Sequence, residues 1–98
     1  TTSAAKLRAR SATMRRALTG FTKLYAARYG RDGIRMNNVL PGFIDNNDWP
    51  PALLGNIPMP RAGTLAEVAS TVAFLAGRES GYVTGQDILV DGGVVRGL

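Results

Sequence analysis

The spacing of apolar residues predicts a long helix in the first part of the chain. From about Ala4 to Tyr29, apolar side chains recur at steps of three and four, the period of one helix face. These residues are Met14, Ala17, Leu18, Phe21, Leu24 and Tyr25. The stretch is rich in Ala, Leu, Lys and Arg, which are good helix formers. Gly30 is expected to end the helix, and Gly33 to form the turn that follows.

Two short strands are predicted after this helix. Ile34–Leu40 shows imperfect alternation of apolar positions, which indicates burial on both faces, as in a parallel sheet. It ends at Pro41-Gly42. Gln86–Val90 is the second predicted strand, and the glycine-containing segment after it closes the element.

Residues 43–63 show little regular pattern and contain four of the five prolines. Loops of this length inside compact domains are usually functional lids or binding loops. We therefore expect a mobile lid over about 43–63, with a short helix around Pro51–Leu54.

A second helix is predicted to begin after Thr64. Thr64 as N-cap and Glu67 three residues later form the pattern of a capping box. Val68, Val72 and Leu75 are expected to form its buried face, with Gly77 at its end. The order helix, strand, lid, helix, strand predicts an α/β fold with parallel strands joined by helical crossovers. Two strands do not form a stable sheet alone, so this unit is expected to be incomplete.

Composition excludes several classes of function. The 98 residues allow at most one small domain, and they include no cysteine and no histidine. Disulfides, thiolate or imidazole metal sites and Ser-His or Cys-His catalysis are therefore excluded for this chain, and we expect no metal. No apolar run approaches the roughly 20 residues of a membrane span. The chain begins without Met or an apolar signal core, so we expect a processed or truncated start. The absence of cysteine suits a reducing compartment, so we expect a cytoplasmic protein.

The net charge of +5 is concentrated in the first third of the chain. Residues 1–35 carry nine Lys/Arg and one Asp (9 − 1 = +8), whereas residues 36–98 carry three Arg and six acidic residues (3 − 6 = −3). Such asymmetry can mark a nucleic-acid surface, but it is more often a solvated helix face. No interleaved exposed aromatics or recognition motif accompany the basic helix, so we expect no nucleic-acid partner.

Three segments, in this order and spacing, resemble the short-chain dehydrogenase/reductase family. Residues 17–23 (ALTGFTK) look like the second half of its active-site helix. Residues 33–44 (GIRMNNVLPGFI) are similar to its sixth strand and the following Pro-Gly turn, and residues 82–93 (YVTGQDILVDGG) to its C-terminal strand. The resemblance implies that residues 1–98 are the C-terminal portion of a doubly wound Rossmann-type domain. It implies an oxidoreductase that uses NAD or NADP and a small-molecule carbonyl or alcohol.

The resemblance also assigns candidate cofactor residues. In the family, the backbone just after the Pro-Gly turn contacts the nicotinamide carboxamide, which points here to Pro41, Gly42 and Ile44. A Thr normally follows four residues after the Gly, and this chain has Asn46 there, which still donates and accepts hydrogen bonds. The lid usually sets the substrate in the family, and the apolar lid residues here indicate either a hydrophobic carbonyl or alcohol or a lid that packs onto the core. They are Trp49, Leu53, Leu54, Ile57 and Met59.

The catalytic positions depart from the family pattern. The family uses a Tyr that passes a proton and, four residues later, a Lys that lowers the Tyr pKa and holds the ribose. Counting back from residues 17–20 places these roles at Ser11 and Arg15. An aliphatic hydroxyl is a much weaker acid than a phenol, whereas Arg15 keeps the positive charge and can bind ribose or phosphate oxygens. The family's Gly-rich phosphate turn has no match in the chain.

Three functions remain open from the sequence. The first is a fragment of an NAD(P)-dependent oxidoreductase whose N-terminal half is lost or carried by another chain. The second is a non-catalytic family member that acts as an assembly subunit, since the active-site helix and last strand usually form subunit interfaces in this family. A homo-oligomer, dimer or tetramer, is expected in either case. The third, least favoured, is a basic nucleic-acid-binding module.

Overall fold

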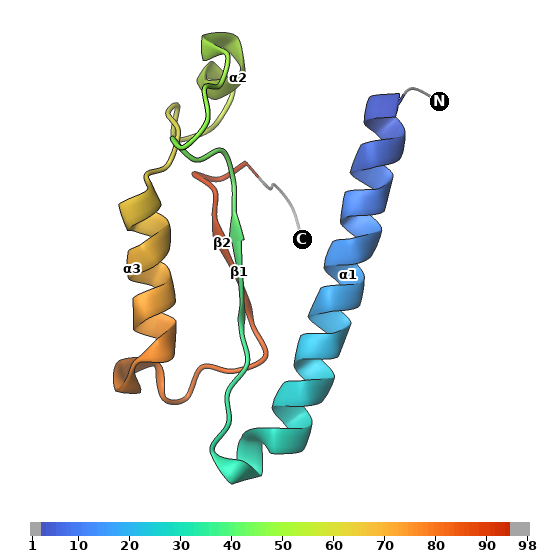
Figure 1. The fold of residues 1–98 in the computed structure, drawn as a ribbon, viewed down its shortest axis with the longest axis vertical. Helices are drawn as coiled ribbons and strands as arrows, with labels where there is room; N and C mark the ends of the chain where they lie inside the picture. Colours follow the sequence, from blue (N-terminus) through green and yellow to red (C-terminus); the bar gives the residue numbers. More distant parts are fainter. Residues whose placement is uncertain (1–2, 95–98) are drawn as a thin grey trace. The chain divides into compact units, whose positions relative to one another are not determined.

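The computed structural model describes residues 3–94 (Figure 1), and these residues form two compact units. The first unit contains the described residues up to Asn38, together with Val83–Gln86. The second contains Val39–Tyr82 and the chain from Asp87 onward. Each unit is therefore built from segments that lie far apart in the sequence.

The strands β1 (Asn38–Pro41) and β2 (Asp87–Val90) form a two-stranded parallel sheet. The Asn38 N–H donates to the Gln86 carbonyl at 2.8 Å, and the Gly42 N–H donates to the Val90 carbonyl at 3.0 Å. The parallel α/β arrangement expected from the sequence is confirmed. Because both strands run in one direction, their carboxyl ends meet at the same edge.

The strand predicted at Ile34–Leu40 is wrong at its beginning, because β1 starts only at Asn38. The preceding residues bond to the Val83–Gln86 segment largely through side chains. Asn37 Nδ2 donates to the Val83 carbonyl at 2.9 Å, and Asn37 Oδ1 accepts from the Gln86 N–H at 3.0 Å. The side-chain amide of Asn37 thus both donates to and accepts from the Val83–Gln86 segment. These side-chain bonds replace the regular backbone hydrogen bonds of a strand there. The second strand is shorter than predicted by one residue.

The first unit is dominated by α1 (Ser3–Tyr29), which ends where the sequence predicted. A 3₁₀ turn, η1 (Gly30–Asp32), follows, and Gly33 takes a positive φ of 74° that favours glycine. The apolar stripe predicted on α1 is not buried among the described residues, since the Met14 and Leu24 side chains are 70% and 74% exposed. The face that this unit buries instead carries Thr22 and Ala26.

Small side chains on α1 allow the Val83–Gln86 segment to approach it closely. Gly85 has a φ of 72°, and a Cβ built there would lie 3.3 Å from the Ala26 Cβ. Lys23 Nζ donates to the Gly85 carbonyl at 2.8 Å, and Thr22 Oγ1 donates to Asn38 Oδ1 at 3.0 Å. Close backbone approach and buried hydrogen bonds therefore select Thr22 and Ala26, not the larger apolar residues, for this face.

The second unit contains α3 (Leu65–Ala76), which contacts β2 and begins with the predicted capping box. Thr64 Oγ1 accepts from the Glu67 N–H at 3.1 Å, while the Glu67 carboxylate accepts from the Thr64 N–H at 2.9 Å. The prediction of a buried face on α3 is wrong: no residue of the helix is buried, and Val72 is half exposed. A two-stranded sheet offers too little surface to cover a helix of this length.

Between the strands, α2 (Pro51–Gly55) lies where a short helix was predicted, with Pro at its first position. Ile57 is buried just beyond it, and the Met59 N–H donates to the Gly92 carbonyl at 3.0 Å. A second 3₁₀ turn, η2 (Arg78–Ser80), follows α3. Across the described residues, no helix is both long and apolar enough to cross a membrane.

Candidate functional site

The carboxyl end of β1 requires glycine at position 42. An ideal Cβ on Gly42 would lie 2.8 Å from the Asp91 Cβ and 2.9 Å from the Asp91 Cα. Carbon atoms at optimal separation lie about 3.5–4.0 Å apart, so any side chain would force the two strand ends apart. The Pro41-Gly42 turn thus brings the backbone after β1 directly beside the end of β2.

Gly63 holds one side of the segment that follows this turn. The Asp45 N–H donates to the Gly63 carbonyl at 2.8 Å, and the Gly63 N–H donates to the Phe43 carbonyl at 2.9 Å. These bonds form an isolated parallel bridge centred on Ile44. A Cβ on Gly63 would lie 3.1 Å from the Ile44 Cδ1, so Gly63 permits the close approach. Gly63, which lies nineteen positions further along the chain, thereby fixes the position of Ile44.

The backbone N–H of Ile44 is an open hydrogen-bond donor. Ile44 is only 7% exposed, yet its N–H has no acceptor among residues 3–94. In extended backbone the N–H and C=O of one residue point to the same side, which here is the side away from Gly63. A backbone amide of a buried residue normally has a partner. This donor fits the carboxamide of a nicotinamide, the group that the resemblance assigns to this position.

Asn46 lies two residues further on, with an exposed side chain. Its amide makes no hydrogen bond with another described residue, so it can donate and accept toward a ligand. Pro41 is exposed and Gly42 half-buried. All four predicted cofactor residues of this segment therefore lie in one continuous stretch of the second unit.

The apolar residues predicted for the lid occupy different environments. Trp49 Nε1 donates to the Ile44 carbonyl at 2.8 Å, so this side chain contacts the candidate site directly. Leu53 and Met59 are exposed, Leu54 is half-buried, and Ile57 is buried. The exposed members leave apolar surface on this segment.

Ser11 and Arg15 lie in the first unit, on α1. Both are exposed, and their separation of four residues places them on one helix face. The spacing that the family's proton donor and cation need is therefore present, with different chemical groups. Ser11 and Arg15 as functional residues remain predictions.

A charged pair stabilises the start of α3 on the lid side. The guanidinium of Arg61 donates two hydrogen bonds of 2.9 Å to the Glu67 carboxylate. These bonds, followed by that from the Thr64 N–H, lower the pKa of Glu67 to about 2. The pair is exposed and belongs to the helix cap, so we assign it no role in chemistry.

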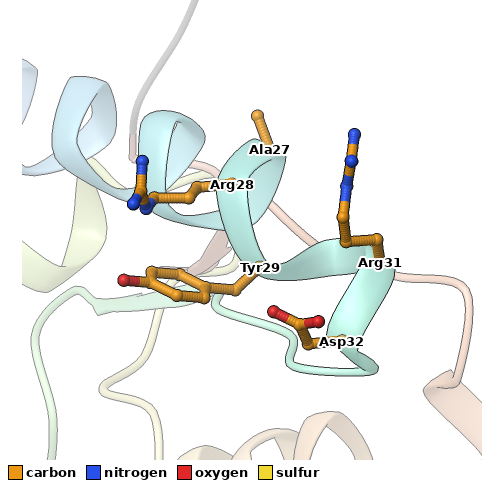
Figure 2. Close-up of a pocket in the computed structure, with 5 residues that line it drawn as sticks. All are labelled: Ala27, Arg28, Tyr29, Arg31 and Asp32. Atoms are coloured by element: carbon orange, nitrogen blue, oxygen red, sulfur yellow. The ribbon is translucent and has the colours of Figure 1, made fainter.

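A separate pocket of about 380 Å³ lies where α1 ends (Figure 2). It is lined by Ala27, Arg28, Tyr29, Arg31 and Asp32. Arg28 lies over the Tyr29 ring, 5.6 Å from its centroid. The pocket contains none of the predicted site residues. Within the part of the chain that the structure describes, no group of three potential metal-ligating side chains is found.

Sequence reasoning missed the contacts that shape the candidate site. Each of these contacts joins segments of different local structure. They are the Gly63 bridge, the packing of Gly42 against Asp91 and the hydrogen bond from Trp49. Glycine at positions 42 and 63 was the available signal, because glycine often marks close backbone approach. The sequence analysis predicts a role for Gly42 but none for Gly63.

Comparison with known proteins identifies the family. A family model described as enoyl-(acyl carrier protein) reductase matches residues 3–95. The (2S)-[(R)-hydroxy(phenyl)methyl]succinyl-CoA dehydrogenase subunit BbsC of Thauera aromatica is 43% identical over 86 residues, which are 84% of this chain and 34% of that protein. The 3-oxoacyl-[acyl-carrier-protein] reductase FabG of Vibrio harveyi is 42% identical over 82 residues, covering 76% of this chain and 34% of that protein.

Solved structures give the same result for the fold. A blue fluorescent protein from a metagenomic library, solved in complex with NADPH, superposes with a TM-score of 0.75 and 37% identity. The match covers 82% of this chain and 35% of that one. The chain thus spans about a third of the length of these relatives. The matched Rossmann-type fold and the sequence relatives together establish that this chain belongs to the short-chain dehydrogenase/reductase family of oxidoreductases.

Proposed function

We propose that this chain supplies the nicotinamide end of the cofactor site in an NAD(P)-dependent oxidoreductase. The observation that carries the proposal is the open N–H of Ile44, a buried residue at the carboxyl end of β1. Dinucleotides bind outside the carboxyl ends of strands in doubly wound sheets. A relative solved with NADPH supports the choice of cofactor. The substrate class is a small-molecule carbonyl or alcohol.

Each predicted catalytic or cofactor residue has a defined role in this proposal. The Ile44 N–H and the Asn46 side chain bind the nicotinamide end, and Pro41-Gly42 places them at the sheet edge. Arg15 binds ribose or phosphate oxygens as a fixed cation. The bound cofactor supplies or accepts the hydride. Ser11 occupies the position of the proton donor, and because its hydroxyl is a weak acid, we expect slow turnover.

The rest of the cofactor site is proposed to lie on polypeptide beyond these 98 residues. The chain spans about a third of its relatives' length, and it has no Gly-rich phosphate turn. The native protein is this chain together with whatever polypeptide completes the fold in the cell. We propose that it is a homo-oligomer.

The first test is cofactor binding by the native protein, followed by nicotinamide fluorescence on titration of NADH and NADPH. The expected result is saturable binding of at least one of them. Asn46→Thr, which introduces the residue usual in the family, should change the affinity by roughly two- to tenfold, the contribution of one hydrogen bond. Asn56→Thr, the same substitution at an exposed position at the end of α2, is the matched control and should leave the affinity unchanged. Unaltered fluorescence at saturating cofactor would refute the proposal.

The second test concerns the proton donor. The double variant Ser11→Tyr/Arg15→Lys restores a phenol and an ammonium group at the family spacing. Turnover of NAD(P)H with acetoacetyl-CoA as the probe should rise by about 10²–10⁴-fold, the usual contribution of a placed acid or base. Ser11→Phe/Arg15→Lys has the same bulk without the hydroxyl and should show no gain. Equal rates in both double variants would remove Ser11 and Arg15 from the site.

A second function, that of a non-catalytic assembly subunit, is favoured by two observations. Serine replaces the expected tyrosine at position 11, while large apolar side chains such as Met14 and Leu24 are exposed on the same helix. This function predicts a stable oligomer without turnover. Sedimentation of the native protein as a monomer would contradict it.

A further inference from the structure

The residues beside the open Ile44 amide include an aromatic pair from the predicted lid. Trp49 and Phe43 pack edge to face, with ring centroids 4.7 Å apart and an interplanar angle of 69°. Aromatic pairs prefer this arrangement over a face-to-face sandwich. The pair joins the lid to the segment that directly follows the Pro41-Gly42 turn.

The indole also makes a polar contact with this segment. Trp49 Nε1 donates to the Ile44 carbonyl at 2.8 Å, and the Asn47 N–H donates to the same oxygen at 3.3 Å. Trp49 is half-buried, and the indole N–H is the only polar group of its side chain. Because this N–H bonds to the backbone, it is not available to a substrate.

The side on which Trp49 lies follows from the Gly63 bridge. Gly63 bonds to the Phe43 carbonyl and to the Asp45 N–H. The N–H and C=O of Ile44 therefore both point away from Gly63 in this extended segment. Trp49 bonds to that C=O, so the indole lies on the same side of the backbone as the open N–H.

We propose that Trp49 is a positioning residue for the nicotinamide end of the cofactor. It holds the Ile44 carbonyl and the Phe43 ring, and so limits rotation of the two peptide groups that flank Ile44. The inference rests on the proposed function and goes beyond it, because Trp49 acts here through the backbone and not as a substrate contact of the lid.

The proposal predicts an effect restricted to one end of the dinucleotide. Trp49→Phe keeps an aromatic ring for Phe43 but removes the N–H that bonds to Ile44. In the native protein its affinity for NAD(P)H should fall by roughly three- to tenfold, the loss of one hydrogen-bonded restraint. Its affinity for ADP-ribose, or for 2′-phospho-ADP-ribose if the protein uses NADP, should stay within about twofold, because these ligands lack nicotinamide.

Tyr82→Phe is the matched control, since it removes one polar atom from an aromatic ring that is fully exposed. It should change neither affinity. Equal weakening of both ligands by Trp49→Phe would overturn the inference, because the effect would then be structural and not specific to nicotinamide. Unchanged NAD(P)H affinity in Trp49→Phe would overturn it as well. If the unsubstituted protein binds neither ligand, the proposed function itself fails.

Discussion

Alanine in place of Gly42 tests the packing at the carboxyl ends of the two strands. The added Cβ would lie 2.8 Å and 2.9 Å from the Cβ and Cα of Asp91. Both atoms are close to the backbone, so no rotation of the Asp91 side chain can relieve the contact. The ends of β1 and β2 must instead separate, which strains the hydrogen bond of 3.0 Å from the Gly42 N–H to the Val90 carbonyl.

The magnitude follows from three terms. Overpacking in a well-ordered region costs about 1–3 kcal/mol, and weakening the hydrogen bond adds up to about 1 kcal/mol. Alanine also reduces the conformational entropy of the unfolded chain, which offsets about 0.4–1 kcal/mol. The free energy of unfolding should therefore fall by about 1–3 kcal/mol.

The assay is urea unfolding of the native protein, followed by circular dichroism. Gly20→Ala is the matched control, because Gly20 lies inside α1 and its Cβ would meet nothing within 4 Å. Removing a glycine from a helix interior should raise the free energy of unfolding by about 0.5–1 kcal/mol. A glycine-to-alanine substitution should thus lower the free energy of unfolding at position 42 and raise it at position 20. A Gly42→Ala variant as stable as the unsubstituted chain would refute the close packing of Gly42 on Asp91.

Three further predictions concern the two units separately. Thr64→Ala removes the N-cap of α3 and should lower the free energy of unfolding by about 1 kcal/mol in urea titrations; no change would refute the cap. Because the folded-state pKa of Glu67 is about 2, below the ordinary 4.5, its carboxylate stabilises the fold above pH 4.5 and loses that effect as pH falls toward 2. The difference in urea midpoint between the unsubstituted chain and Glu67→Gln should shrink over that window, and a constant difference would contradict the ion pair with Arg61. Thr22→Val removes the buried donor to Asn38 and should cost about 1 kcal/mol, whereas Thr71→Val, whose hydroxyl bonds only within α3, should cost less than about 0.5 kcal/mol; equal costs would contradict a buried bond.

Features set by a few neighbouring residues were predictable from the sequence. The capping box of Thr64 and Glu67 forms as expected, because both partners lie within one helical turn. The end of α1 at Tyr29 follows from Gly30 and from the positive φ of Gly33. The Pro41-Gly42 turn also ends β1 as predicted. The family itself was recognisable for the same reason, since its matching segments are short and continuous.

The tertiary structure alone decided which helix face is buried and how the candidate site is held. On α1, close approach of Gly85 selects the small residues Thr22 and Ala26 over the apolar stripe. At the site, Gly63 and Trp49 fix opposite sides of Ile44. Periodicity reports only which side chains avoid water, whereas these contacts depend on which distant backbone approaches and at what distance. Contacts of that kind have no local signature, because a glycine or tryptophan in the sequence does not specify its partner.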